Sequence, residues 1–281
     1  MEPAAASPPR LTDTASQETR SPAVWRIHRA GHDDSDLWLA FEHPAPLRLV
    51  LERGTHVPQL PGVDELLTFV HLLPGIETPS DIQKQFEAWV AQGDAEAPYL
   101  DVSGRSVRLV WKGHRCLAYT GSQGADDCIA AAVMFSHLHG TLLAEETRLE
   151  LAWQAMTDDA ALTHDVRRVA LREQGRVNGM TRQFQTARIA VSRMDIALQR
   201  PELTMSPAAR RLFSELALQA DLASRIRLLD DAVEVGEDLY ERANDRLIEH
   251  RNYLVEVWIE TAILLAILAE LAVLLFDFFS K

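Results

Sequence analysis

Two neighbouring histidines are the residues whose spacing could best support metal chemistry. His137 and His139 stand two positions apart, so on a β-strand both side chains would point to one side and could ligate a metal ion. In a helix the same spacing turns the two side chains away from each other, and the residues around them have a helical pattern. We therefore expect structural histidines. Asp126 and Asp127 precede the same apolar segment, and carboxylates there favour the N-terminus of a helix over acid–base catalysis.

A nucleophilic site would have to be built from His114, Cys116 and Asp101, which could converge in an uncharacterised hydrolase. The sequence contains no phosphate-binding glycine-rich loop and no set of four metal ligands at a typical spacing. We accordingly expect no catalytic residue, no cofactor and no metal, and hold the hydrolase as an alternative. Cys116 and Cys128 are the only cysteines, too few for a disulfide framework, so both are expected in the core of a protein from a reducing compartment.

One group of arginines could contact anionic lipid headgroups or RNA. Phe184 is the only aromatic residue among them, so stacking on bases is not supported. The formal net charge of −13 also argues against a general nucleic-acid binder, and we expect no specific DNA binding. The alternative is a solvated helix face with ion pairs. The group consists of Arg167, Arg168, Arg172, Arg176, Arg182, Arg188 and Arg193.

The last residues, 258–281, form an apolar run that predicts a C-terminal membrane anchor. Roughly a dozen Leu, Ile, Val and Phe contribute about −0.5 kcal/mol each, whereas a carboxylate near the centre costs about 3 kcal/mol, so insertion is favoured. Glu260 and Asp277 lie toward the ends, where this penalty falls, and Glu270 lies inside the run. About 20 residues suffice to cross a hydrocarbon layer of about 30 Å. A buried soluble helix is the alternative.

At 100° per residue the anchor has two faces. Small residues and carboxylates share one face, which favours close helix association in a membrane and predicts a homo-oligomer or a protein partner. In the alternative interpretation Glu270 only weakens the anchor. The association face consists of Ala262, Ala266, Ala269, Glu270, Val273 and Asp277. The opposite face, expected to contact lipid, consists of Leu264, Ile267, Leu268, Leu271, Leu274, Leu275 and Phe278.

The flanks of the anchor predict its orientation. Arg242, Arg246 and Arg251 precede it, and only Lys281 follows. By the positive-inside tendency the soluble part stays in the cytoplasm, with a bacterial inner membrane as the expected location. Residues 1–22 are rich in Ala, Pro, Ser and Thr without an apolar run, so they predict a disordered leader and no secretory signal.

Residues 23–121 predict a small α+β domain. Residues 47–51 have the composition of a strand, and 107–111 with 116–119 predict a hairpin around Lys112-Gly113-His114. Two short helices are expected between them. The first has Val63, Leu66, Leu67 and Val70 at helical spacing, and the second begins at Thr78-Pro79 and buries Ile82, Phe86, Trp89 and Val90.

Residues 122–257 predict long helices over 142–156, 166–198 and from Pro207 into the anchor, with breaks near His139-Gly140, Gly175 to Gly179 and Pro201 to Pro207. The last helix has a heptad seam that predicts an antiparallel coiled-coil hairpin with the arginine-rich helix before it. Asp230 and Asp231 lie on its solvated flank, and Gly236 and His250 are its irregular positions. The seam consists of Leu222, Ile226, Leu229, Val233, Gly236, Tyr240, Ala243, Leu247, His250, Leu254 and Val257.

Four segments between Arg115 and Phe276 resemble the family named "required for meiotic nuclear division". They are Ala131-Ala132-Val133-Met134-Phe135-Ser136-His137, the stretch from Arg188 to Pro201-Glu202-Leu203, Arg225-Ile226-Arg227-Leu228-Leu229-Asp230, and the apolar helix with Glu270. The chain departs from the family pattern at Gln199, Met205 and Asp230. The resemblance implies an N-terminal α+β domain, a helical hairpin and a membrane-anchored C-terminus, without enzymatic activity. Mitochondrial members are linked to translation, which implies a possible ribosome contact.

These observations favour an α+β protein ending in a single C-terminal transmembrane helix, which acts as a membrane-anchored interaction or scaffold protein. The expected divisions are 1–22, 23–121, 122–257 and 258–281. A second hypothesis is an oligomeric channel or ion transporter that resembles the magnesium-channel architecture, although the Gly-Met-Asn of that pore mouth is absent. In that case Glu270 would line the pore.

Overall fold

The computed structural model describes residues 22–30, 37–54, 56–57, 62, 64–74, 80–104, 106–164, 173–201 and 205–280, with side chains described up to residue 272. Contacts divide the chain into two compact units. Unit 1 comprises Met1–Thr147 and Ile189–Asp230, and unit 2 comprises Arg148–Arg188 and Asp231–Lys281. The predicted leader falls outside the described residues, apart from Pro22.

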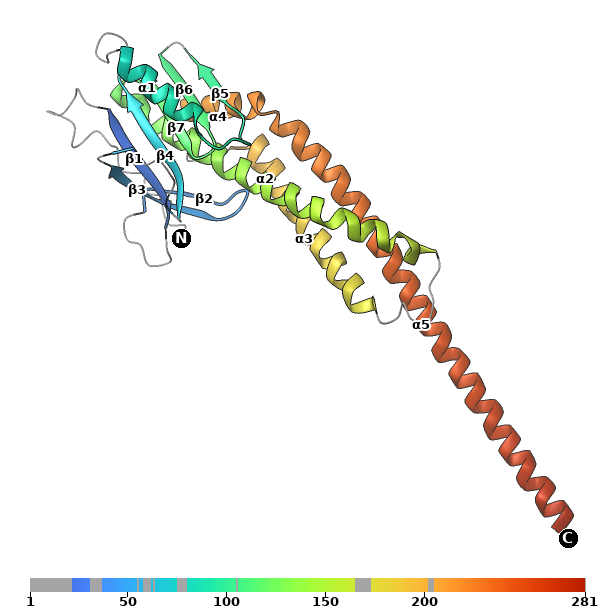
Figure 1. Ribbon diagram of the computed structural model, residues 1–281. Coiled ribbons are helices and arrows are strands. Elements are labelled where there is room, and N and C mark those ends of the chain that lie inside the picture. The colour runs from blue at the N-terminus through green and yellow to red at the C-terminus, as the bar shows by residue number, and fades with distance from the viewer. Residues whose placement is uncertain are drawn as a thin grey trace. The chain divides into compact units, whose positions relative to one another are not determined.

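The protein has an α+β fold, with a mixed sheet in the N-terminal part and long helices in the C-terminal part (Figure 1). The strands are β1 (Ala23–Arg29), β2 (Leu39–Phe41), β3 (Leu47–Gly54), β4 (Glu65–Leu72), β5 (Leu100–Ser103), β6 (Val107–Lys112) and β7 (Arg115–Thr120). The helices are α1 (Ser80–Ala91), α2 (Ala125–Asp159), α3 (Gln174–Gln199), α4 (Pro207–Gln219) and α5 (Leu222–Ser280), with short 3₁₀ turns η3 (Ser122–Gly124) and η4 (Ala160–Thr163).

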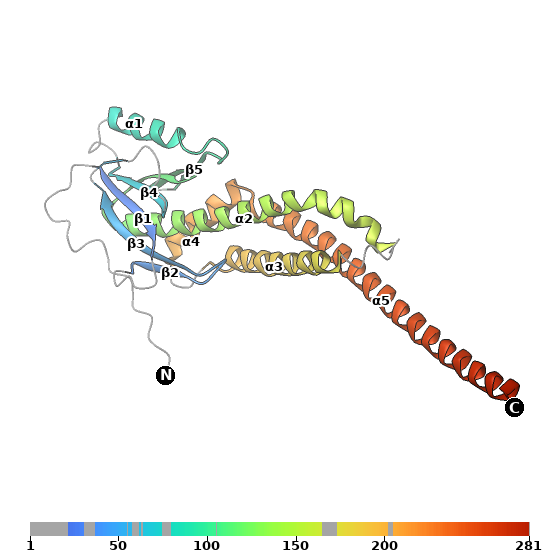
Figure 2. The same cartoon turned by 60° about the horizontal axis from the view of Figure 1, so that its bottom comes forward.

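The described strands form a seven-stranded sheet in unit 1, in the order β2-β3-β1-β4-β7-β6-β5. Strands β4 and β7 pair in parallel, and the other neighbours are antiparallel. Helix α1 covers one face, and the first part of α2 covers the other (Figure 2). The predicted strand at 47–51 and the predicted hairpin are confirmed as β3 and as β6 with β7. Gly113 has a φ of 62° in the hairpin turn, a conformation that favours glycine.

The helix predicted from Val63, Leu66, Leu67 and Val70 is wrong, because this segment contains the central strand β4. Leu67, Thr68, Phe69 and Val70 are all buried, since α1 and α2 cover both faces of the sheet. A strand buried on both faces reads as a continuous apolar run without alternation, which a helical spacing can match by chance. Val63 itself lies outside the described residues.

Helix α1 confirms the second predicted helix, although its expected cap at Thr78-Pro79 lies outside the described residues. Its last turn contains no basic residue. Instead, Arg115 donates to the carbonyl of Trp89 at 2.6 Å, and Lys112 donates to the carbonyl of Ala91 at 2.9 Å. Two cations from the sheet therefore satisfy the carbonyls at the end of the helix, where the macrodipole favours positive charge.

Helix α2 is continuous, so the predicted break at His139-Gly140 is wrong. Between Ile129 and His139 nearly every residue is buried, and Trp111 of β6 donates to Ser136 at 2.8 Å. Of the described helices, the one spanning Ser122–Thr163 is long and apolar enough to cross a membrane, but 67% of its most apolar window is buried inside the protein. Burial of the residues on both sides of Gly140 explains why this glycine does not end the helix, because their packing outweighs the low helix propensity of glycine.

The segment expected as one helix from Pro207 onward is two helices. Helix α4 begins after Ser206, whose hydroxyl accepts from the Ala209 amide at 3.0 Å, and ends at Gln219. Asp221 then has a φ of 52°, a conformation that ends the helix and that Asp tolerates better than most residues. The predicted break between Pro201 and Pro207 is confirmed, whereas the predicted break from Gly175 to Gly179 is wrong because α3 contains both glycines.

Unit 2 contains the end of α2, the first part of α3 and most of α5. Phe184 of α3 stacks on Tyr240 of α5, with ring centroids 5.6 Å apart, and Arg188 faces Glu234 at 3.9 Å. These contacts place α3 and α5 antiparallel, as the sequence predicts. Every seam position of α5 from Leu222 to Leu247 is buried, His250, Leu254 and Val257 are half-buried, and residues from Trp258 to Ala272 are exposed.

Candidate functional site

The two histidines considered for metal binding have structural partners. His137 donates from Nε2 to the carbonyl of Ala45 at 2.9 Å, and the His139 ring packs against Trp111 and Phe135 with centroids 5.3 and 5.7 Å away. Burial lowers the pKa of both imidazoles. Within the described ranges, no group of three or more His, Cys, Asp and Glu could hold a metal ion.

The residues considered for a hydrolase are not brought together. The strand register aligns Asp101 with Val110 and Leu117, whereas Cys116 aligns with Trp111 on the opposite face. Burial also raises the pKa of the Cys116 thiol well above its usual value, which favours the protonated thiol over the reactive thiolate. Cys116 and Cys128 are both buried and unbridged, which confirms their prediction as core residues. Asp126 and Asp127 lie in the first turn of α2, as predicted.

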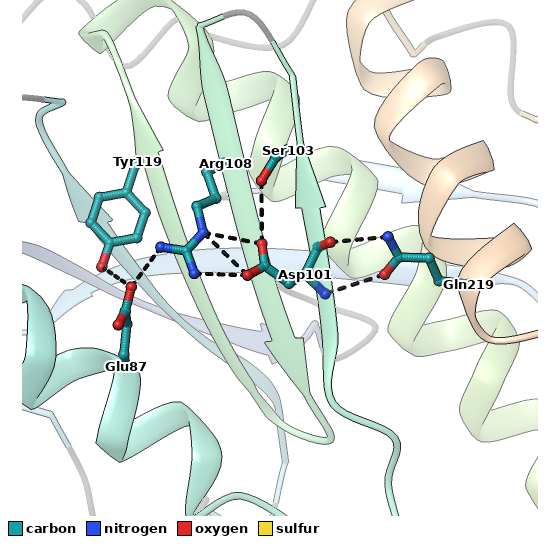
Figure 3. A network of polar contacts seen from close by, with 6 residues as sticks. All are labelled: Glu87, Asp101, Ser103, Arg108, Tyr119 and Gln219. Atoms are coloured by element: carbon teal, nitrogen blue, oxygen red, sulfur yellow. Dashed lines mark hydrogen bonds and ion pairs between the residues drawn. The ribbon is translucent and has the colours of Figure 1, made fainter.

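A polar network in unit 1 surrounds Arg108 on β6 (Figure 3). Its guanidinium donates to Asp101 of β5 at 2.7 Å and to Glu87 of α1 at 2.6 Å, and Tyr119 donates to Glu87 at 3.1 Å. These carboxylates, Asp101 foremost, raise the pKa of Arg108. Since Arg108 pairs with both carboxylates, the network connects α1 to the edge of the sheet.

The same network reaches α4 through Gln219. Its side-chain amide donates to the backbone carbonyl of Asp101 at 2.9 Å and accepts from the Asp101 amide at 3.2 Å. The Gln219 side chain thus makes the two hydrogen bonds to the Asp101 backbone that a neighbouring antiparallel strand would make to this residue of β5. This arrangement blocks part of the sheet edge and fixes α4 beside it.

The arginine group is only partly described, since Arg167, Arg168 and Arg172 lie outside the described residues. Arg176 is committed to Asp159, which is 2% exposed, through bonds of 2.6 and 2.5 Å. Tyr240 also donates to Asp159 at 3.0 Å. Arg188 faces Glu234, and Arg182 and Arg193 are exposed. Arg176 is therefore a structural residue, whereas a headgroup contact through the other arginines stays a prediction.

A pocket of about 680 Å³ lies in unit 2 beside the end of α2. Two of its arginines are engaged by acids of their own helix, Arg242 with Asp238 and Arg246 with Glu249. These two ion pairs leave Asp245 as the one carboxylate of the lining without a cation among the lining arginines, so the lining has a small excess of negative charge. It is lined by Ala160, Thr163, His164, Val235, Asp238, Leu239, Arg242, Asp245, Arg246 and Glu249.

The last part of α5 is the surface most unlike that of an ordinary soluble protein. Trp258 is 74% exposed, and the consecutive residues Ile263, Leu264 and Leu265 are 55%, 57% and 61% exposed. Because consecutive residues are 100° apart, these side chains point to different sides of the helix. In both views no other described element of unit 2 lies beside this end of α5 (Figures 1 and 2). Ala262, Ala266, Ala269 and Glu270 are exposed too, and the side chains of Val273 and Asp277 lie beyond those described.

Comparisons with known proteins add little to this geometry. No protein-family model matches the chain, and no curated protein matches it significantly. Among solved structures, it is similar to the soluble domain of CorA from Methanocaldococcus jannaschii, at 9% identity and a TM-score of 0.27, over 82% of this chain and 98% of that chain. A TM-score this low carries no conclusion about function.

The sequence did not reveal the polar partners that organise both units. Arg108, Arg115 and Asp159 find their partners 7, 26 and 17 positions away along the chain, across strands or between helices. Tyr240 was predicted only as a member of the seam, without a polar partner. Such partners depend on how distant segments pack, and no local pattern encodes them.

Proposed function

We propose that the protein is a membrane-anchored interaction protein in which residues 257–276 of α5 cross a lipid bilayer. The observation that carries this proposal is the exposure of large apolar side chains around α5 after Val257. These 20 residues extend about 30 Å at 1.5 Å per residue, which matches the hydrocarbon thickness of a bilayer.

A bilayer fits this segment better than a protein groove does. A helix that docks in a groove needs an apolar stripe on one side, whereas a helix apolar on all sides is either buried or in a membrane. Tyr253 and Trp258 are 61% and 74% exposed where the segment begins, a position favoured by aromatic residues at a membrane interface. Arg251 precedes them and favours a cytoplasmic location of the chain before residue 257.

The part of the chain before residue 257 would then hold a partner at the membrane. The resemblance to the meiotic nuclear division family supports a partner from the translation apparatus, because the mitochondrial members are linked to translation. The association face that includes Glu270 stays a prediction.

Alkaline carbonate extraction of membranes from cells that express the full-length chain tests the anchor. The parent should resist extraction, whereas the double variant Leu264→Arg with Leu268→Arg should be released, because each arginine near the centre costs about 3 kcal/mol. The matched control is Leu218→Arg with Leu228→Arg, which changes two exposed leucines outside the segment, 74% and 68% exposed. The control should resist extraction like the parent.

Two outcomes would contradict the proposal. One is release of the parent by carbonate, which would mean a peripheral or soluble protein. The other is equal retention of the Leu264→Arg, Leu268→Arg variant and the parent, which would mean that another part of the chain attaches it to the membrane.

A further inference from the structure

Glu270 is the one carboxylate that lies deep within the proposed membrane span. Residues 257–276 contain Glu260 and Glu270. Glu260 lies about 4.5 Å from the beginning of the span, whereas Glu270 lies about 5 Å from its middle, at 1.5 Å per residue. Because the Cα–Cβ bonds of a helix tilt toward its N-terminus, the Glu260 side chain leans toward the interface and the Glu270 side chain leans toward the middle of the bilayer. Glu270 would therefore be surrounded by hydrocarbon.

Another placement of the span does not avoid a charged residue in the hydrocarbon. A span of about 20 residues that ended before Glu270 would begin at His250. It would contain Arg251 and Glu256, and so it would exchange Glu270 for two other charged residues. Ionisable side chains in hydrocarbon are costly, and those that occur pair with one another or face the interior of a helix bundle. A partner for Glu270 would therefore favour the placement at 257–276.

Helix α5 itself supplies no partner for Glu270. The side chain is exposed, and no hydrogen bond or ion pair joins it to another described residue. Within the helix, the residues three and four positions away all have apolar side chains. Thr261 differs, because its hydroxyl donates to the carbonyl of Val257 at 2.7 Å and is satisfied there. The apolar neighbours of Glu270 are Ala266, Ile267, Val273 and Leu274.

A second copy of α5 offers no cation to Glu270 either. Residues 252–280 contain no Lys, Arg or His. Copies anchored at the same depth would bring one Glu270 beside another, and two carboxylates repel each other unless one is protonated. Charge complementarity therefore favours a transmembrane helix of a different protein that carries a Lys or Arg at this depth.

The side of α5 that carries Glu270 has room for a second helix. Ala262, Ala266 and Ala269 lie on this side, and all three are exposed. Small side chains let the backbones of two membrane helices approach closely. Ala266 lies one turn before Glu270, in the direction in which the Glu270 side chain leans. A cation of a neighbouring helix can therefore reach the carboxylate over Ala266.

We propose that Glu270 forms an ion pair within the bilayer with a Lys or Arg of another protein, whose transmembrane helix packs against Ala262, Ala266 and Ala269. This inference rests on the proposed membrane anchor, which places Glu270 in hydrocarbon. It assigns the association face predicted around Glu270 to a different protein and not to a second copy of this chain.

The full-length protein reconstituted in phosphatidylcholine vesicles tests the ion pair with model peptides. Each peptide is a Leu-Ala helix that spans the bilayer, contains no Trp and has a dansyl group at one end. One peptide has a single Lys near its middle, and the matched peptide has Leu there. Energy transfer from Trp258 to the dansyl group measures binding, and the Trp258→Phe variant measures the contribution of the other tryptophans. Half-maximal transfer should need about ten-fold less of the Lys peptide than of the Leu peptide, as expected for a polar contact between membrane helices.

Three variants locate the contact on α5. Glu270→Leu should remove the preference for the Lys peptide. Ala266→Leu, which adds bulk where the Glu270 side chain leans, should reduce the preference several-fold. The control Leu268→Phe adds bulk on the opposite side of the helix and should leave the preference unchanged.

The outcomes separate the ion pair from the anchor itself. Equal binding of the Lys and Leu peptides by protein that stays in the vesicles after alkaline carbonate would overturn the ion pair while the anchor stands. Self-association of the parent that the Lys peptide does not displace, and that Glu270→Leu abolishes, would assign this face to a second copy and would also overturn the proposal. Release of the parent from the vesicles by carbonate would overturn the anchor, and the ion pair with it.

Discussion

Helix α2 and the last part of α5 are both rich in apolar residues, but their surroundings are opposite. In α2 the side chains from Ile129 to Phe135 are almost all buried, with the sheet against one side. In α5 the side chains from Ile263 to Leu271 are mostly more than half exposed. Composition alone thus does not decide where an apolar helix resides. The decisive property is whether the rest of the chain supplies cover on every side.

The largest loss of stability is expected for a substitution in the fully buried part of α2. Phe135→Ala removes a buried ring whose centroid is 4.7 Å from that of Trp111, and should lower the free energy of unfolding by about 3–5 kcal/mol. Chemical denaturation followed by Trp fluorescence in detergent measures this. The matched change Leu264→Ala should alter the unfolding free energy by less than about 0.5 kcal/mol. A comparable loss in both variants would mean that the end of α5 is packed within the protein.

A second prediction concerns the part of α5 that packs against α3. A Cβ atom at Gly236 would lie 2.2 Å from the Phe184 ring, so Gly236→Ala should force a rearrangement that costs about 1–3 kcal/mol. Thermal unfolding monitored by circular dichroism checks this. Phe184→Leu in the same chain should recover part of the loss by making room. Unchanged stability of Gly236→Ala would show that α3 and α5 are not in close contact there.

The buried histidines predict acid sensitivity of the α2 region. Burial lowers the folded-state pKa of His137 and His139, so below the unfolded value of about 6.5 the unfolded state binds more protons than the folded state. Stability is therefore full above about pH 6.5 and decreases as the pH falls toward the folded pKa, by up to about 1.4 kcal/mol per pH unit for each histidine.

Thermal unfolding between pH 7.5 and 5.5 measures this slope. The double variant His137→Gln with His139→Phe should have a shallower pH dependence than the parent, because neither replacement titrates in this range. His250→Gln, a change in the half-buried part of α5, is the comparison. A slope that stays unchanged in the double variant would place the acid sensitivity elsewhere.

The smallest expected effect concerns the sheet edge. Gln219→Ala removes two hydrogen bonds to the backbone of Asp101 near the surface and should cost about 1 kcal/mol. Gln199→Ala, which removes a surface bond between Gln199 and Asp195, is the control and should have a smaller effect. Denaturant unfolding of both variants tests the difference. Equal losses of unfolding free energy would show that the bonds from Gln219 to β5 stabilise the protein no more than an ordinary surface bond does.

Elements with a clear local signal were predictable. The hairpin around Gly113 and the helix that buries Val90 have distinct turn and spacing patterns, and both are present. Strand β4 was mistaken for a helix because burial on both faces erases the alternation that identifies a strand. Helix α4 ends at Gln219 without a Gly or Pro in the sequence to mark the turn at Asp221. The polar partners of Arg108 and Asp159 could not be predicted for a different reason, because these contacts join different strands and helices.

The sequence by itself determined the α+β class, the heptad seam of α5 and the apolar character of its C-terminal end, because periodicity and composition are local properties. Only the tertiary structure decided that α2 is covered and that residues 258–272 of α5 are exposed. Burial depends on which distant segments come together, and so do the pairing of Arg176 with Asp159 and the close approach of Phe184 to Gly236. Two apolar helices thus differ in environment because the side chains of the first part of α2 are buried within unit 1, whereas those at the end of α5 are exposed.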